Sequence, residues 1–300
     1  MSEKKVLPAP WIQNTLLSTV FLEQLVSGSS TPDSSNMDTS TTSHTDIIKI
    51  TVESKVVERD GQKITVLRNV KLVIPQGEFL SISGPNGCGK TTLLKIVAGL
   101  DKDFVGETNA NRRINSVGFI FQNYKESLFP WMNNLDNISY SSLLKGDSKK
   151  ERYEKVKSFL YKHDLVVDLN AYPYQQSGGQ QQVVSILRAL VYHPNLLIMD
   201  EPFSSLDEAK RLRMHGIIQN YWEEFRPTII FVSHDLDETL LLADRLAVMR
   251  KLSRKEQGSI LGEFNVDFAR PRRAKLIETI DFFNLKSQVA ALIRKDVENG

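Results

Sequence analysis

The eight residues from Gly84 to Thr91, Gly-Pro-Asn-Gly-Cys-Gly-Lys-Thr, constrain the fold of this chain more than any other segment. They match the phosphate-loop pattern, they follow the apolar run Phe79 to Ser83, and they precede the helix-favouring run Leu93 to Ala98. The three glycines let consecutive backbone N–H groups turn inward around a polyphosphate at the start of a helix. A strand, this loop and a helix in that order predict an α/β fold that binds a nucleotide.

The side chains at the end of the loop indicate which ligand it takes. Lys90 supplies a positive charge for the phosphates, and Thr91 offers a hydroxyl oxygen to Mg²⁺, a hard cation that bridges the β- and γ-phosphates. The predicted ligand is therefore a nucleoside triphosphate with Mg²⁺, which we take to be ATP. The residues expected to bind it are Gly84, Pro85, Asn86, Gly87, Cys88, Gly89, Lys90, Thr91 and Thr92.

Cys88, the only cysteine of the chain, lies inside this loop. Its neighbour Lys90 and the following helix N-terminus both favour a thiolate over a thiol. We therefore expect alkylation of Cys88 to inactivate the protein and bound nucleotide to protect it.

Polar residues follow three further apolar runs. Asp200 and Glu201 follow Leu196 to Met199, and His234 comes just after Thr228 to Val232. Such short aliphatic runs are typical of central parallel strands, and open α/β sheets bind their ligands at the carboxyl ends of those strands.

Gln122 follows its own apolar run in the same way. We expect Asp200 to hold Mg²⁺ together with Thr91 and Gln122. Glu201 is expected to polarise the attacking water, with His234 at the γ-phosphate and Gln122 completing the catalytic set. Each residue alone fits a turn or a solvated side chain, but their joint order favours a single site.

A further motif, Gln176-Ser177-Gly178-Gly179-Gln180, lies before the run at 196–199. With the motifs above it resembles the nucleotide-binding domain of ABC transporters, from about Ile47 to Lys251. The resemblance implies a P-loop NTPase fold, a RecA-like core with an antiparallel β edge and an inserted helical subdomain. It also implies a homodimer, or pairing with another ATPase subunit, in which Ser177, Gly178, Gly179 and Gln180 close on the nucleotide of the opposite subunit. Ser204 to Asp207 resembles the D-loop, which couples the two sites.

Two shorter stretches, Gln122 to Ile138 and Phe268 to Arg272, resemble the nitrate, sulfonate and taurine importer ATPases. That branch implies a separate membrane permease, an indirect partnership with a substrate-binding protein, and peripheral attachment at the cytoplasmic face of the membrane. Four residues would line the groove for the permease, although each of them fits simple packing equally well: Leu128, Phe129, Trp131 and Met132.

Three positions depart from the family pattern. Val57 stands where an aromatic residue commonly stacks on adenine, Gln176 replaces a leucine, and Val183 replaces an arginine. The loss of an aromatic stack weakens base binding by about 1 kcal/mol.

The expected organisation has three parts. Residues 1–46 form an extension that contains a weakly amphipathic helix, Trp11 to Val26, and a disordered Ser/Thr-rich linker. Residues 47–262 form the nucleotide-binding domain, with a helical subdomain at about 123–191. Residues 263–300 form a helical tail.

Composition excludes some functions. The net charge of +2 argues against a nucleic-acid surface, and no run reaches the roughly 18 apolar residues of a membrane-spanning helix. Import of a small solute is the leading hypothesis. Export, lipid trafficking and cell division remain as alternatives, because the ATPase core is shared. Action on DNA or ribosomes usually goes with paired nucleotide domains or long coiled coils, which this sequence lacks. Val57 and Gln176 leave nucleotide sensing open, although Glu201 and His234 argue against it.

Overall fold

The computed structural model describes residues 47–59, 61–110, 116–252 and 258–299. The expected N-terminal extension, with its helix and its linker, lies outside these ranges. The described residues form two compact units. A smaller unit comprises Asn123–Tyr192, and a larger unit comprises residues 47–122 and 193–299.

The larger unit contains a six-stranded sheet in the order β5-β6-β7-β3-β8-β9. The first five strands of that order pair in parallel, and β9 pairs with β8 in the antiparallel sense. Every residue of β3, β6 and β7 is buried, as expected for central strands. The strands are β3 (Phe79–Ser83), β5 (Val117–Ile120), β6 (Leu196–Asp200), β7 (Thr228–Val232), β8 (Arg245–Met249) and β9 (Ile260–Asn265).

A second sheet of the same unit is antiparallel, with the order β2-β1-β4. It contains β1 (Ile47–Arg59), β2 (Gln62–Pro75) and β4 (Val105–Thr108). The second half of β2 alternates buried and exposed residues, which is the pattern of a strand with one face on the core. The predicted antiparallel edge and parallel core are therefore confirmed.

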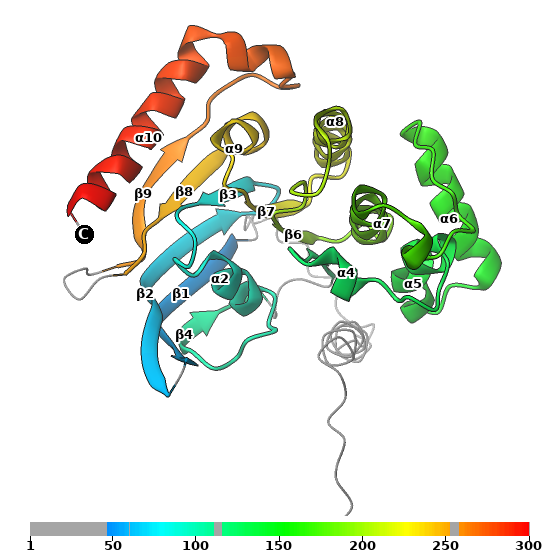
Figure 1. Cartoon of the computed structure of the whole chain (residues 1–300), viewed down its shortest axis with the longest axis horizontal. Helices are drawn as coiled ribbons and strands as arrows, with labels where there is room; N and C mark the ends of the chain where they lie inside the picture. The colour runs from blue at the N-terminus through cyan, green and yellow to red at the C-terminus, as the bar shows by residue number, and fades with distance from the viewer. Residues whose placement is uncertain (1–46, 60, 111–115, 253–257, 300) are drawn as a thin grey trace, which may run out of the picture. The chain divides into compact units, whose positions relative to one another are not determined.

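Helices connect and cover these strands in the larger unit. They are α2 (Lys90–Val97), α8 (Glu208–Phe225), α9 (Leu236–Leu242), the 3₁₀ helix η2 (Ala274–Glu278) and α10 (Ile280–Asn299). Helix α10 runs beside β9 (Figure 1) and buries Phe282 and Val289 in one apolar cluster with Leu240 of α9 and Leu246 of β8. The boundary expected at residue 262 falls inside β9, because this strand completes the sheet before the tail begins.

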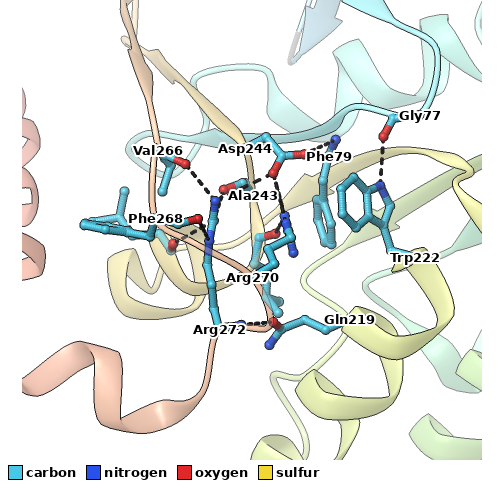
Figure 2. A network of polar contacts seen from close by, with 12 residues as sticks. Gly77, Phe79, Gln219, Trp222, Ala243, Asp244, Val266, Phe268, Arg270 and Arg272 are labelled. Carbon is cyan, nitrogen blue, oxygen red and sulfur yellow. Dashed lines mark hydrogen bonds and ion pairs between the residues drawn. The ribbon is translucent and has the colours of Figure 1, made fainter. Parts of the chain in front are cut away.

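Two arginines attach the segment after β9 to the rest of the larger unit (Figure 2). Arg272 is buried and donates hydrogen bonds to the backbone carbonyls of Val266, Phe268, Leu240 and Ala243. Burial lowers the pKa of Arg272 to about 10. We call Arg270 and Arg272 the arginine clamp.

Arg270 makes the second half of the clamp. Its guanidinium donates to Asp244 Oδ1 at 2.7 Å and to the Leu242 carbonyl at 2.6 Å, and it stacks 4.1 Å from the Trp222 ring (Figure 2). The Trp222 indole N–H in turn donates to the Gly77 carbonyl at 2.9 Å. The clamp therefore ties the tail to α8, to the end of α9 and, through the Arg270 guanidinium 5.8 Å from the Phe79 ring, to the strand before the phosphate loop.

The smaller unit is helical in the part that the structure describes. It contains α4 (Tyr124–Ser127), α5 (Asn134–Leu144), α6 (Lys149–Lys162), the 3₁₀ helix η1 (Pro173–Gln175) and α7 (Gly178–Leu190). The side chains of Asn133, Ser148 and Ser177 cap the N-termini of α5, α6 and α7, which satisfies backbone N–H groups that lack partners within the helix.

The four residues expected to line a permease groove differ in exposure. Leu128 and Phe129 are buried within the smaller unit, and Phe129 packs against Tyr140 with ring centroids 4.6 Å apart. Met132 is half-buried, whereas Trp131 is 59% exposed. Leu128 and Phe129 therefore pack inside the unit and Trp131 is the most exposed of the four, while the groove itself stays a prediction. Within the described ranges, no helix combines the length and apolar character that a bilayer crossing requires.

Candidate nucleotide site

The phosphate loop requires glycine at two positions for steric reasons. Gly84 (φ 150°) and Gly89 (φ 99°) both have positive φ, which L side chains rarely adopt. A Cβ atom on Gly84 would lie 2.4 Å from the Met249 carbonyl oxygen, and one on Gly89 would lie 2.6 Å from a Leu67 methyl group. The loop therefore keeps its shape because the backbone packs directly against β8 and β2.

Lys90 begins α2 and folds back over the loop. Its ammonium donates to the carbonyls of Gly84 at 2.7 Å and Pro85 at 3.0 Å, and its Nζ lies 4.0 Å from the Cys88 sulfur. Cys88 is only 1% exposed, and burial raises the pKa of its thiol despite the nearby charge. The expectation of a reactive thiolate is therefore wrong, because loss of water outweighs the attraction of Lys90.

The carboxyl end of β6 meets the phosphate loop. The Thr91 hydroxyl donates to Asp200 Oδ2 at 2.7 Å, so two residues that are 109 positions apart in the chain lie side by side. Asp200 is buried, and both this burial and the charge of Glu201 raise the pKa of its carboxyl. A buried carboxylate of this kind is costly on its own and becomes favourable beside a cation.

The donor set at this position fits Mg²⁺. The Thr91 hydroxyl donates a hydrogen bond to Asp200, so its oxygen lone pairs remain available to a metal ion. Asp200 adds carboxylate oxygens. These are the hard oxygen ligands that Mg²⁺ prefers.

Glu201 lies between two other predicted residues. Gln122 Nε2 donates to Glu201 Oε2 at 3.3 Å, and His234 Nδ1 lies 3.5 Å from the same oxygen. The three side chains come from the carboxyl ends of β5, β6 and β7, which neighbour each other in the sheet. The structure therefore brings all three proposed catalytic residues together.

The Ser177 motif lies in the smaller unit, at the start of α7. The Ser177 hydroxyl accepts from the Gln180 N–H at 3.4 Å, and the Gln180 side chain accepts from the Ser177 N–H at 2.9 Å. This reciprocal capping box fixes the helix start. Gly178 permits a close approach there, since a Cβ atom would lie 2.5 Å from the Tyr124 hydroxyl. Gly179 follows in the first turn of α7.

Asp207, at the end of the D-loop motif, caps the N-terminus of α8. Its carboxylate accepts from the Lys210 N–H at 2.9 Å and pairs with the Lys210 ammonium at 2.6 Å. These bonds hold the pKa of the exposed Asp207 carboxyl below its usual range.

Two residues close to His234 in the chain were not predicted from the sequence. Ser233 and Glu238 are both buried, and the Ser233 hydroxyl donates a hydrogen bond to Glu238 Oε2, yet neither residue was assigned a role from the sequence. A faint signal was present, because an acidic residue four positions after His234 falls in the first turn of a helix.

A phosphate loop next to a strand-end carboxylate pair, on a largely parallel sheet, defines a P-loop nucleoside triphosphatase. Comparison with known proteins makes this more specific. The family model described as "ABC transporter" matches residues 67–204. An uncharacterized ABC transporter ATP-binding protein of Methanocaldococcus jannaschii, MJ0412, is 37% identical over 242 residues, covering 78% of this chain and 88% of that protein.

Two relatives carry more specific names. The aliphatic sulfonates import ATP-binding protein SsuB of Bacillus subtilis is 35% identical over 253 residues, covering 83% of this chain and 94% of the relative. The nitrate import ATP-binding protein NrtD of Synechocystis is 33% identical over 258 residues, covering 82% and 95%.

Solved structures agree with these relatives. A dimeric bacterial ABC transporter cassette, MJ0796, is similar with a TM-score of 0.63 and 28% identity, covering 74% of this chain and all of that one. The same cassette has been solved as a dimer in a post-hydrolysis state bound to ADP and phosphate, with the same scores. This chain belongs to the family of ABC transporter ATP-binding proteins, and it is an ATP-binding ATPase.

Proposed function

We propose that this chain is the ATPase subunit of an importer and that it energises uptake of a small sulfonate- or nitrate-like anion through a separate permease. The observation that carries this proposal is the match to two import ATP-binding proteins over nearly their whole length. Exposed Trp131 is the residue we assign to the permease contact. On this proposal the chain acts at the cytoplasmic face of the membrane, and the permease works with a substrate-binding protein.

We assign the site residues as follows. The loop amides and Lys90 hold the phosphates of ATP, and Thr91 and Asp200 hold Mg²⁺, with Gln122 completing its ligands. A bound Mg²⁺ neutralises charge on the phosphate oxygens. Glu201 orients the attacking water.

The remaining assignments concern the γ-phosphate. His234 contacts it in the same chain. Ser177 and Gly179 of a second copy approach it from the opposite side, which the dimeric state of the related cassette supports. Hydrolysis then opens the closed pair and resets the permease.

Deleting the gene and measuring uptake of labelled taurine, ethanesulfonate and nitrate tests the importer proposal. We expect uptake of one of these anions to fall to background, to return with the wild-type gene, and to stay absent with the Glu201→Gln gene. Normal uptake of all three, with a defect in efflux or cell division instead, would contradict import and leave the ATPase assignment intact.

A further inference from the structure

His234 has little packing of its own to hold it in place. Its side chain is 66% exposed, and its one described polar contact is the 3.5 Å approach of Nδ1 to Glu201 Oε2. The position of this ring therefore depends on the backbone on either side of it. That backbone is the short turn between β7 and α9 (Figure 1).

The residue before His234 makes a bridge across this turn. Ser233 is 2% exposed, its hydroxyl accepts from the Asp235 N–H at 3.0 Å, and the same hydroxyl donates to Glu238 Oε2 at 2.8 Å. Both flanks of His234 are thus fixed by one oxygen atom. Because a hydroxyl has a single proton, the carboxylate of Glu238 decides which way that proton points.

The other oxygen of the Glu238 carboxylate faces two basic side chains of α8. His215 Nε2 lies 3.4 Å and Arg211 Nε lies 3.7 Å from Glu238 Oε1, and both His215 and Glu238 are buried. One carboxylate oxygen therefore faces α8 while the other faces the turn. Between buried groups such as His215 and Glu238, an electrostatic contact is stronger than it would be in water.

Hydrogen bonds in the first turn of α9 also hold the backbone after His234. Asp235 Oδ1 accepts from the Asp237 N–H at 2.8 Å, and the Thr239 hydroxyl donates to the Asp235 carbonyl at 2.9 Å. The next acidic residue, Asp237, turns away and pairs with Lys286 of α10 at 2.6 Å. Of the two acidic side chains in this turn, Glu238 faces the residues next to His234 and Asp237 faces the tail helix.

We propose that Glu238 is a positioning residue that acts through the Ser233 hydroxyl to hold His234 where it meets the γ-phosphate. The proposal rests on the assigned role of His234. The relay consists of two hydrogen bonds: the Asp235 N–H, just after His234, donates to the Ser233 hydroxyl, and that hydroxyl donates to the Glu238 carboxylate. Loss of either bond frees the turn and lowers the share of enzyme with His234 correctly placed.

Steady-state ATPase kinetics of the full chain tests this relay. We expect Glu238→Ala and Ser233→Ala each to lower kcat about tenfold, with KM for ATP within about twofold, because the relay orients a group that acts on the transition state. Glu238→Gln should recover most of the rate, since its amide oxygen accepts from Ser233. Asp237→Ala, in the same turn but facing α10, is the matched control and should keep the wild-type rate.

A double-mutant cycle with His234→Ala separates positioning from general damage. If Glu238 acts through His234, adding Glu238→Ala to His234→Ala costs no further rate in single-turnover hydrolysis. Ser233→Ala gives the same comparison with a smaller change in volume, in case Glu238→Ala fails to fold.

Four results would overturn the proposal. A wild-type rate in Glu238→Ala and Ser233→Ala, or a further loss of rate on the His234→Ala background, would remove the relay while the role of His234 stands. A Glu238→Gln variant as slow as Glu238→Ala would exclude the hydrogen-bond route. A wild-type rate in His234→Ala would instead refute the assigned role of His234, and the relay with it.

Discussion

Glu201 adopts a left-handed backbone conformation, with φ 47°, directly after β6. Its N–H donates to the Val232 carbonyl at 2.9 Å, so the pairing of β6 with β7 continues through a residue with unusual dihedral angles. A glutamate in this conformation costs on the order of 1 kcal/mol. The geometry turns the carboxylate toward Gln122 and His234, at the expense of local stability.

The first prediction concerns the chemistry of this carboxylate. Glu201→Gln keeps the shape of the side chain but removes the carboxylate that we assign as the base, so ATP turnover should fall roughly 10² to 10⁴-fold while ATP still binds. Phosphate release and calorimetry measure the two quantities. Lys90→Ala is the contrasting variant. It should lose ATP affinity, because the substitution removes the ammonium group that compensates the negative charge of the phosphates. Turnover near the wild-type rate in Glu201→Gln would refute the assignment.

The second prediction follows from the burial of Cys88. A thiol with a raised pKa has less thiolate than an ordinary cysteine at neutral pH, and a buried one is also shielded from reagents. Maleimide labelling of the native protein should therefore be slow even without nucleotide, and fast after unfolding in urea. Rapid labelling of the native protein that ATP slows would contradict this prediction and support the reactive thiolate expected from the sequence.

At the scale of elements, the arginine clamp joins the tail to three parts of the larger unit (Figure 2). In the sequence, Phe268 to Arg272 stands out only through its resemblance to one branch of the family. The structure shows its physical role, because the acceptors of Arg272 are backbone carbonyls at the end of α9 and after β9. Truncation of this side chain leaves those buried carbonyls without partners.

The third prediction follows from that loss. Arg272→Ala should lower the free energy of unfolding by about 2 to 4 kcal/mol, since several hydrogen bonds from one buried cation disappear together. Urea unfolding measures this change. The neighbouring Arg273 is exposed, so Arg273→Ala is the matched control and should stay within about 0.5 kcal/mol of wild type. Equal stability of the two variants would show that the clamp contributes little.

At the scale of the whole molecule, the assigned site needs two copies of the chain. Ser177 and Gly179 act on a nucleotide bound by the partner in this assignment, so ATP itself should hold two chains together. The fourth prediction is that Glu201→Gln protein with saturating ATP elutes as a dimer, because in the proposed cycle hydrolysis releases the closed pair. Size exclusion with light scattering, with and without ATP, measures the change.

A second substitution tests whether the site is shared. Adding Ser177→Arg should abolish the ATP-dependent dimer through steric and charge conflict, while ATP binding to the monomer remains. Tyr161 is exposed on α6, in the same unit, so Tyr161→Arg should leave the dimer intact. A dimer that persists with Ser177→Arg would contradict the shared site.

Much of this protein could be predicted from local patterns. The phosphate loop and its helix are contiguous in the chain, and the buried runs of β3, β6 and β7 end at the polar residues that form the site. Parallel strands bring their carboxyl ends to one edge of a sheet, so Asp200, Glu201 and His234 were expected to meet. Contiguous patterns of this kind depend on backbone conformation and strand direction, which short stretches of sequence encode.

Other properties were decided by tertiary structure alone. The burial of Cys88, which reversed the expected direction of its pKa shift, depends on the packing of the whole loop against its neighbours. Arg272 binds carbonyl oxygens, which every residue carries, so its acceptors have no signature in the sequence. The hydrogen bond from Ser233 to Glu238, and the approach of His215 of α8 to the same carboxylate, likewise arise only when separate elements pack together. The sequence by itself determined which residues are candidates for the chemistry, because their order along the strands is local. Their burial and their hydrogen-bond partners depend on distant residues that meet only in the folded chain.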